Sequence, residues 1–275
     1  MDTREQLTTH LQEIEAWEKD QKGLWFWEKL GRLPFKLLDK MTPSFIQDKI
    51  GVLVAELGSY IQTGGKYLIN EQSMIQKIRN ESSYKDIHTI PDIGKMPLED
   101  MITLSKKLQK DRVKLATVQG ASTGFGGLFT LVIDIPVILG MALKSLQEIA
   151  IIHGYDPNDI QERIFIVKCL QFSSADIVGK ESILNELSSM NENKDASENM
   201  ISQLKGWQEV FFTYRDQFGW KKLFQMVPIA GMIFGAYANK GMIQDITETG
   251  IMLYRKRRIY EKFNEIEQRE NSVIE

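Results

Sequence analysis

Apolar residues recur at three- and four-residue intervals along almost the whole chain, which is the period of an amphipathic helix, and alternating β-branched runs are few. We expect a first helix over residues 4–27, broken near Pro34, and a second that starts after Pro43. Residues 80–97 contain two prolines and a glycine and predict a loop, and an amphipathic helix follows over residues 98–120. The pattern therefore predicts an all-α protein.

Two apolar segments interrupt this amphipathic pattern. Residues 115–143 carry one charged side chain and residues 223–239 carry none. Each segment contains glycines four residues apart, a spacing that lets two helix backbones approach closely. We expect the two segments to pack as a central pair of glycine-containing apolar helices. The expected helix-packing or ligand-binding residues are Gly120, Gly124, Gly127, Asp134, Pro136, Gly231 and Gly235.

The first apolar segment is close to the limit for inserting into a bilayer. A span needs about twenty apolar residues. Eleven Leu, Ile, Val or Phe residues lie between positions 125 and 143, and each favours insertion by roughly 0.3–0.6 kcal/mol, whereas a central Asp opposes it by roughly 2.5–3.5 kcal/mol. The glycines and Pro136 make insertion into the bilayer still less favourable, so a lone transmembrane helix is not supported. A buried hairpin, a re-entrant insertion and a reversible membrane contact stay open.

Asp134 is the acid within this apolar segment, and it needs a hydrogen bond, a cation, a proton or water. One interpretation makes it the N-cap of a helix that begins at Pro136, which would divide the segment into two shorter helices. The other makes it a polar point in a hydrophobic cavity that orients a ligand or a partner helix.

Aromatic and basic residues are mixed in residues 23–40, a composition typical of a helix at the membrane interface. A core-packing helix with a solvated basic face is the alternative. The expected membrane-contact residues are Trp25, Phe26, Trp27, Lys29, Arg32 and Lys36. A second basic cluster, residues 255–258, suits lipid headgroups, RNA or a charged helix end stabilised by the helix dipole.

Two further stretches mark boundaries. In residues 153–159, Gly154 suits a helix C-cap, Asp156 an N-cap and Pro157 the first helical position. Residues 179–202 are polar and lack large apolar residues over their middle, which predicts a mobile linker or an insertion.

Composition and charge narrow the chemistry. The net charge of -3 gives no reason to expect nucleic-acid binding. The single cysteine, Cys169, is expected to be a core side chain, and His10, His88 and His153 are expected at surfaces or caps, so we expect no metal and no cofactor. The polar N-terminus is unlike a signal peptide, and we expect a cytoplasmic protein that is peripheral at the inner face of the cell membrane.

A formal match to a hydrolase motif occurs at residues 120–124, which read G-A-S-T-G. The nucleophile elbow requires a strand that leads into the serine, whereas the preceding residues continue a helical pattern. Hydrolysis at Ser122 is therefore the least favoured reading of the chain. We expect binding and not catalysis, and we identify no catalytic residue.

Residues 120–159 combine a glycine-rich start, an apolar Asp-x-Pro core at positions 134–136 and a GYDP turn at positions 154–157, and residues 228–258 form a second block. In these features the chain resembles the EcsC family of bacterial proteins. The resemblance implies a helical, membrane-associated accessory or binding protein with no established biochemical activity, linked to an ABC transporter or another membrane protein system. It offers no catalytic residues.

Taken with the resemblance, the pattern divides the chain into five regions. They are an N-terminal helical region at 1–97, the two parts of the EcsC-like core at 98–178 and 203–263, the polar stretch at 179–202 and a polar tail at 264–275. The expected partner is a membrane surface or a membrane protein, with lipid as a ligand. A soluble helical carrier of a hydrophobic ligand is the alternative function.

Overall fold

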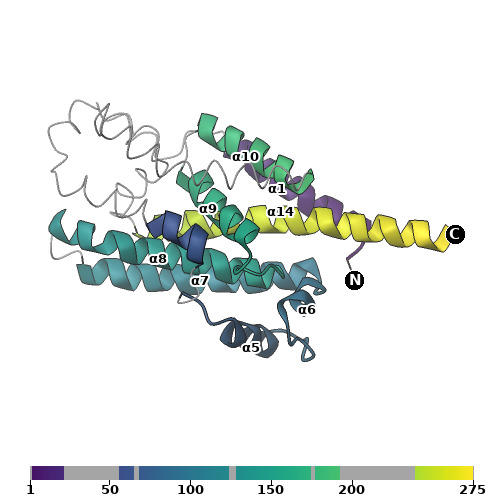
Figure 1. The fold of residues 1–275 in the computed structure, drawn as a ribbon, viewed down its shortest axis with the longest axis horizontal. Helices are drawn as coiled ribbons and strands as arrows, with labels where there is room; N and C mark the ends of the chain where they lie inside the picture. The colour runs from purple at the N-terminus through teal and green to yellow at the C-terminus, as the bar shows by residue number, and fades with distance from the viewer. Residues whose placement is uncertain are drawn as a thin grey trace.

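The computed structural model describes residues 2–21, 56–64, 68–123, 128–174, 177–192 and 239–274 (Figure 1). Within these ranges every regular element is a helix, which confirms the all-α prediction. Residues 56–63 are helical, and the labelled helices are α1 (Arg4–Asp20), α5 (Glu71–Glu81), α6 (Ile90–Gly94), α7 (Leu98–Thr123), α8 (Leu128–Ile152), α9 (Ile160–Ser174), α10 (Ile177–Glu192) and α14 (Asn239–Ile274).

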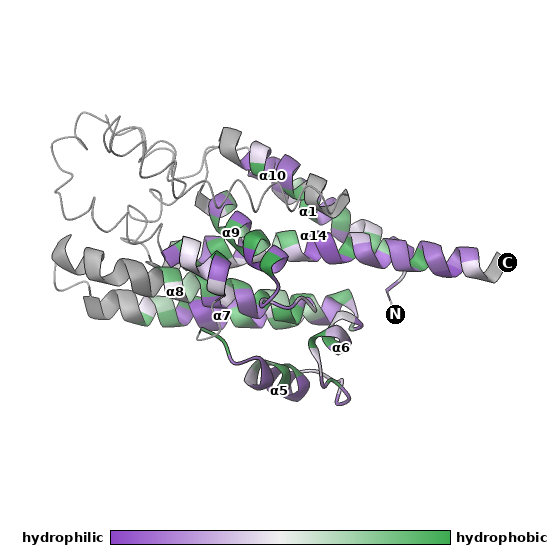
Figure 2. Ribbon diagram, in the orientation of Figure 1, coloured by the Kyte–Doolittle hydropathy of each residue, from purple (hydrophilic) through white to green (hydrophobic). Residues whose placement is uncertain are grey.

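Helix α14 is the centre of the fold, because it packs against α1, α7, α8 and α9. Its 36 residues extend over about 54 Å at 1.5 Å per residue. Ile243, Ile246, Tyr254 and Ile259 on α14 are at most 1% exposed. The expected polar tail, residues 264–275, continues α14 as far as Ile274, and Figure 2 shows mostly hydrophilic residues along that end. The core therefore surrounds the first two thirds of this helix.

Helix α1 begins at a capping box, in which Thr3 and Gln6 exchange hydrogen bonds. Leu7 and Ile14 are completely buried. The helix ends at Asp20, earlier than the expected residue 27, and residues 22–55 lie outside the described part of the chain. The expectations for the aromatic and basic segment at 23–40 therefore stay predictions.

The expected loop at residues 80–97 is confirmed at its ends, since α5 stops at Glu81 and α7 starts at Leu98. Its middle forms the short helix α6, which was not predicted because the two prolines and the glycine indicated a loop. Pro91 occupies the first turn of α6, where a missing N–H costs nothing. Asp92 stabilises that turn by accepting hydrogen bonds from the Thr89 backbone N–H and hydroxyl at 3.0 and 2.7 Å.

Helix α8 is continuous through residues 134 and 136. An N-cap residue needs a non-helical backbone, so the interpretation of Asp134 as the cap of a second helix is wrong. Pro136 removes one backbone donor inside the helix without ending it. The apolar sequence of residues 128–143 thus belongs to one helix.

The turn after α8 is a Schellman motif, as expected for Gly154. The Tyr155 N–H donates to the Ala150 carbonyl at 3.0 Å, the Gly154 N–H donates to the Ile151 carbonyl at 2.9 Å, and Gly154 has a φ of +79°. The expected start of the next helix was wrong by about one turn. Helix α9 begins at Ile160, and its cap is Asp159, whose carboxylate accepts from the Gln161 N–H at 2.9 Å.

The polar stretch at 179–202 also differs from expectation. Its first part, up to Glu192, belongs to helix α10, which packs against α9. Ile183 and Leu187, four residues apart, are 7% and 5% exposed and supply the buried face. Residues 193–238 lie outside the described ranges, so the second apolar segment and its packing against the first stay a prediction.

Candidate functional site

The C-terminal end of α7, from which the chain continues into α8, exposes apolar side chains. We call this the connected end of α7 and α8. Val118 is 69% exposed and Leu115 is 48% exposed, and both lie on the last turns of α7. Among the described residues, Tyr84 and Tyr260 are the other large hydrophobic side chains with substantial exposure, at 39% and 42%. In Figure 1 this end of the α7–α8 pair lies opposite the end that holds both chain termini. Val118 and Leu115 thus form an exposed apolar surface next to the apolar sequence that continues into α8.

Three of the expected packing or ligand residues lie on this helix pair: Gly120 on α7, and Asp134 and Pro136 on α8. Gly124, Gly127, Gly231 and Gly235 lie outside the described residues, as do the membrane-contact residues expected between positions 25 and 36. Ser122 lies within the last turn of α7 and not at a strand-to-helix turn, so the nucleophile-elbow context of the G-A-S-T-G match is absent there.

The basic cluster at residues 255–258 lies inside the fold, and the interpretations as a lipid or RNA surface and as a helix end are wrong. Helix α14 continues for four turns beyond it. Successive residues turn by about 100° along a helix, so the four cations point to different neighbours. They pair with acids as follows: Arg255 with Glu13, Lys256 with Glu18, Arg257 with Glu162 and Arg258 with Glu261. The first three pairs join α14 to α1 and α9, and the fourth lies within α14.

Glu162 is the most buried of these acids, with 5% of its side chain exposed. Its carboxylate accepts hydrogen bonds from the Tyr254 hydroxyl at 2.5 Å and from Arg257 at 2.8 Å. Burial raises the pKa of Glu162, and the Arg257 charge acts in the opposite direction. The Arg257 and Arg258 guanidinium carbons also lie 4.1 and 4.4 Å from the Tyr155 ring centroid. This cluster fixes the turn after α8 against α14, which is a structural role.

His153 follows the last residue of α8, as expected for a cap, but it is completely buried instead of exposed. Its Nδ1 lies 2.8 Å from the Ile149 carbonyl oxygen, so the neutral ring carries its proton there. The ring stacks on Tyr254 with centroids 5.9 Å apart. Burial, with a smaller contribution from Arg258, lowers the pKa of His153 to about 4.

This lowered pKa predicts a pH-dependent stability. The unfolded chain binds a proton at His153 below about pH 6.5, whereas the folded protein does so only near pH 4. The free energy of unfolding should therefore fall as the pH drops from about 6.5 to about 4. Urea unfolding of the wild type and of His153→Gln at several pH values measures this, because the variant lacks the titration. Parallel stability curves for the two proteins would exclude His153 as the cause.

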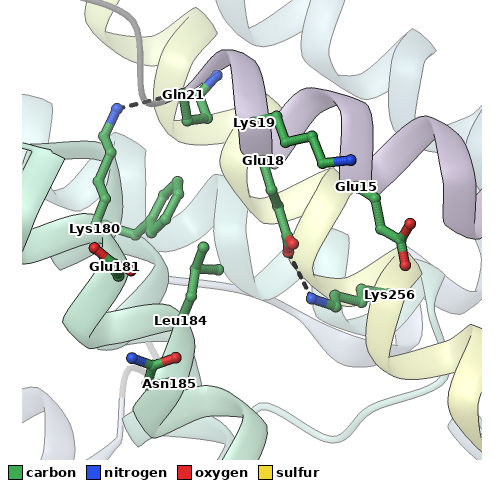
Figure 3. Close-up of a pocket in the computed structure, with 10 residues that line it drawn as sticks. Glu15, Glu18, Lys19, Gln21, Lys180, Glu181, Leu184, Asn185 and Lys256 are labelled. Atoms are coloured by element: carbon green, nitrogen blue, oxygen red, sulfur yellow. Dashed lines mark hydrogen bonds and ion pairs between the residues drawn. The ribbon is translucent and has the colours of Figure 1, made fainter.

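An open cleft of about 300 Å³ lies between α1, α10 and α14 (Figure 3). Lys180 donates to the Gln21 side-chain oxygen at 3.0 Å, and Lys256 pairs with Glu18 at 2.7 Å across it. Charged and amide side chains dominate the lining, which comprises Glu15, Glu18, Lys19, Gln21, Phe172, Lys180, Glu181, Leu184, Asn185 and Lys256.

Two properties of the described residues bear on function. No helix in those ranges combines the length and the apolar character that crossing a bilayer requires. The same ranges contain no cluster of three His, Cys, Asp or Glu side chains arranged to hold a metal ion. Cys169 is completely buried, as expected for a core side chain, and burial raises the pKa of its thiol.

Comparison with known proteins shows to which family this chain belongs. The chain is 55% identical over 264 residues to the "Uncharacterized protein YdbA" of Bacillus subtilis (strain 168), covering 96% of this chain and 97% of that protein. It is 30% identical over 174 residues to "Protein EcsC" of the same organism, covering 63% of this chain and 70% of that protein. No solved structure matches. The model of the EcsC protein family matches residues 8–259, and the chain therefore belongs to this family.

Proposed function

We propose that this protein is a non-enzymatic accessory or binding protein that associates with a membrane through the connected end of α7 and α8. The observation that carries the proposal is the exposure of Val118 and Leu115 on α7. Exposed aliphatic side chains that lead into a longer apolar sequence are typical of a membrane or protein contact. The proposed location is the inner face of the cell membrane.

The sequence around this surface supports a bilayer as the partner. Eleven Leu, Ile, Val or Phe residues follow between positions 125 and 143. Their insertion balance is close to zero, which favours reversible contact over a permanent span. The protein partner implied by the family resemblance, an ABC transporter or another membrane protein system, is part of the same proposal.

Flotation of the purified, detergent-free protein with phosphatidylcholine vesicles, with and without phosphatidylglycerol, tests this function. Wild-type protein should float. Leu115→Asp combined with Val118→Asp should weaken binding about tenfold or more, because each apolar side chain loses part of the roughly 1.5–3 kcal/mol that its transfer from water contributes.

The matched control combines Gln268→Asp with Asn271→Asp, which adds the same charge at exposed positions near the far end of α14. This control should float like the wild type. A stable wild-type protein that floats with neither kind of vesicle would contradict membrane association. If that protein instead carried co-purified lipid, the carrier function would replace the proposed one.

A further inference from the structure

The outward face of α7 carries a row of lysines. Lys106, Lys110 and Lys114 are exposed and lie four residues apart, so they share one helix face. Within the described part of the chain, none of the three has an ion-pair partner. The neighbouring Lys107 differs, because Glu81 on α5 pairs with it at 3.2 Å. A row of like charges at this spacing disfavours the helix on its own, and it becomes favourable when an anionic partner binds.

The lysine row leads directly to the exposed apolar residues. Val118 lies one turn beyond Lys114, and the distance along the helix from Lys106 to Val118 is about 18 Å at 1.5 Å per residue. Asp111 is the exposed acid at the edge of this face, and it leaves the row with a net positive charge. A helix face that joins lysines to exposed aliphatic side chains has the composition of a helix at an anionic lipid surface.

The polar groups around α7 do not neutralise the row. Arg112, on the inner side of the same helix, forms an ion pair with Glu148 of α8. Glu81 is engaged by Lys107. Glu148 and Glu81 are thus already paired with other cations, and the three lysine side chains are exposed.

We infer that α7 binds anionic phospholipid headgroups through Lys106, Lys110 and Lys114, while Val118, one turn beyond Lys114, enters the interface at the end of the row. The inference rests on the proposed membrane association and adds to it the class of lipid and the orientation of α7 along the surface. A bilayer fits the row better than a nucleic acid does, because the apolar side chains at its end gain from leaving water and the backbone of a nucleic acid offers them no apolar partner.

Vesicle binding of a triple variant, Lys106→Gln, Lys110→Gln and Lys114→Gln, tests the inference. Each lysine near an anionic surface contributes about a fivefold gain in binding, so the variant should bind phosphatidylglycerol-containing vesicles about 100-fold more weakly than the wild type at low salt. Binding to pure phosphatidylcholine vesicles should not change. High salt should remove most of the difference, because it screens the lysine charges.

The matched control is Arg4→Gln, Lys85→Gln and Lys95→Gln, which removes the same charge from exposed positions outside α7. It should retain wild-type binding. Wild-type affinity of the α7 variant for anionic vesicles, or an equal loss in the control, would overturn the inference and leave membrane association standing. Failure of the wild type to bind either vesicle would overturn the proposed function itself. Circular dichroism of both variants checks that the helices are intact.

Discussion

Glu162→Gln is expected to lower the free energy of unfolding by about 3 kcal/mol, because it removes the nearest counter-charge of the Arg257 guanidinium and leaves only the Glu261 carboxylate, 3.8 Å from the Arg257 Nε. This value lies at the low end for a broken buried ion pair, since 24% of the Arg257 side chain is exposed. The amide also keeps an acceptor for the Tyr254 hydroxyl. Urea unfolding monitored by circular dichroism measures the change.

Two controls separate this effect from a general loss of charge. Glu270→Gln breaks the exposed pair with Arg4, in which both side chains are 60% exposed, and it should change stability by less than about 1 kcal/mol. Combining Glu162→Met with Arg257→Met should cost less than the two single changes together, because no unpaired charge is left. Additive losses would show that the pair is not coupled.

Gly154→Ala is expected to destabilise the protein by about 2–5 kcal/mol. The left-handed backbone at φ +79° costs a side chain about 1–2 kcal/mol, and overpacking adds about 1–3 kcal/mol. The added Cβ would lie 2.5 Å from the Gly94 Cα and 2.7 Å from the Gly94 nitrogen, both of which are backbone atoms. The turn after α8 and helix α6 would have to separate. A shift of the thermal unfolding midpoint measures this cost.

Gly140→Ala is the matched control within α8. Apart from its chain neighbours and the adjacent backbone of its own helix, no described atom lies within 4 Å of a Cβ placed there, and alanine favours a helix over glycine by about 0.8–1 kcal/mol. This variant should therefore be slightly more stable than the wild type. An equal loss at both positions would contradict the role of the close contact between Gly154 and Gly94.

Local signals predicted those features that depend on neighbours in the sequence. The amphipathic period placed the start of α7 at Leu98, and the conformational freedom of glycine placed the C-cap at Gly154. The start of α9 was misplaced because two aspartates compete. Asp156 forms a turn with Asn158, whose N–H it binds at 2.8 Å, and Asp159 caps the helix instead.

The roles of the basic cluster and of the buried acid could not be predicted from the chain. The partners of residues 255–258 include Glu13, Glu18 and Glu162, which lie 95 residues or more away in the sequence. No local pattern indicates such pairs. For this reason a lipid or RNA surface was predicted at residues 255–258, whereas the structure has ion pairs inside the fold there.

The exposed end of α7 was visible in the sequence only as the beginning of an apolar segment. The spacing of apolar residues along α7 does not tell whether Leu115 and Val118 face the core or solvent. Their exposure depends on how α14 lies beside α7. Gln109 donates to the Gln244 carbonyl at 3.2 Å, which sets this register near the beginning of α14.

Direct contact of Val118 with the bilayer is the central claim, and a fluorophore attached at that position tests it most directly. Cys169→Ala removes the buried thiol, and Val118→Cys then carries a polarity-sensitive label, with Asn271→Cys as the control at the far end of α14. With phosphatidylglycerol-containing vesicles, the label at position 118 should shift to the blue and the label at position 271 should not. A protein that binds these vesicles with no blue shift at position 118 would contradict the account.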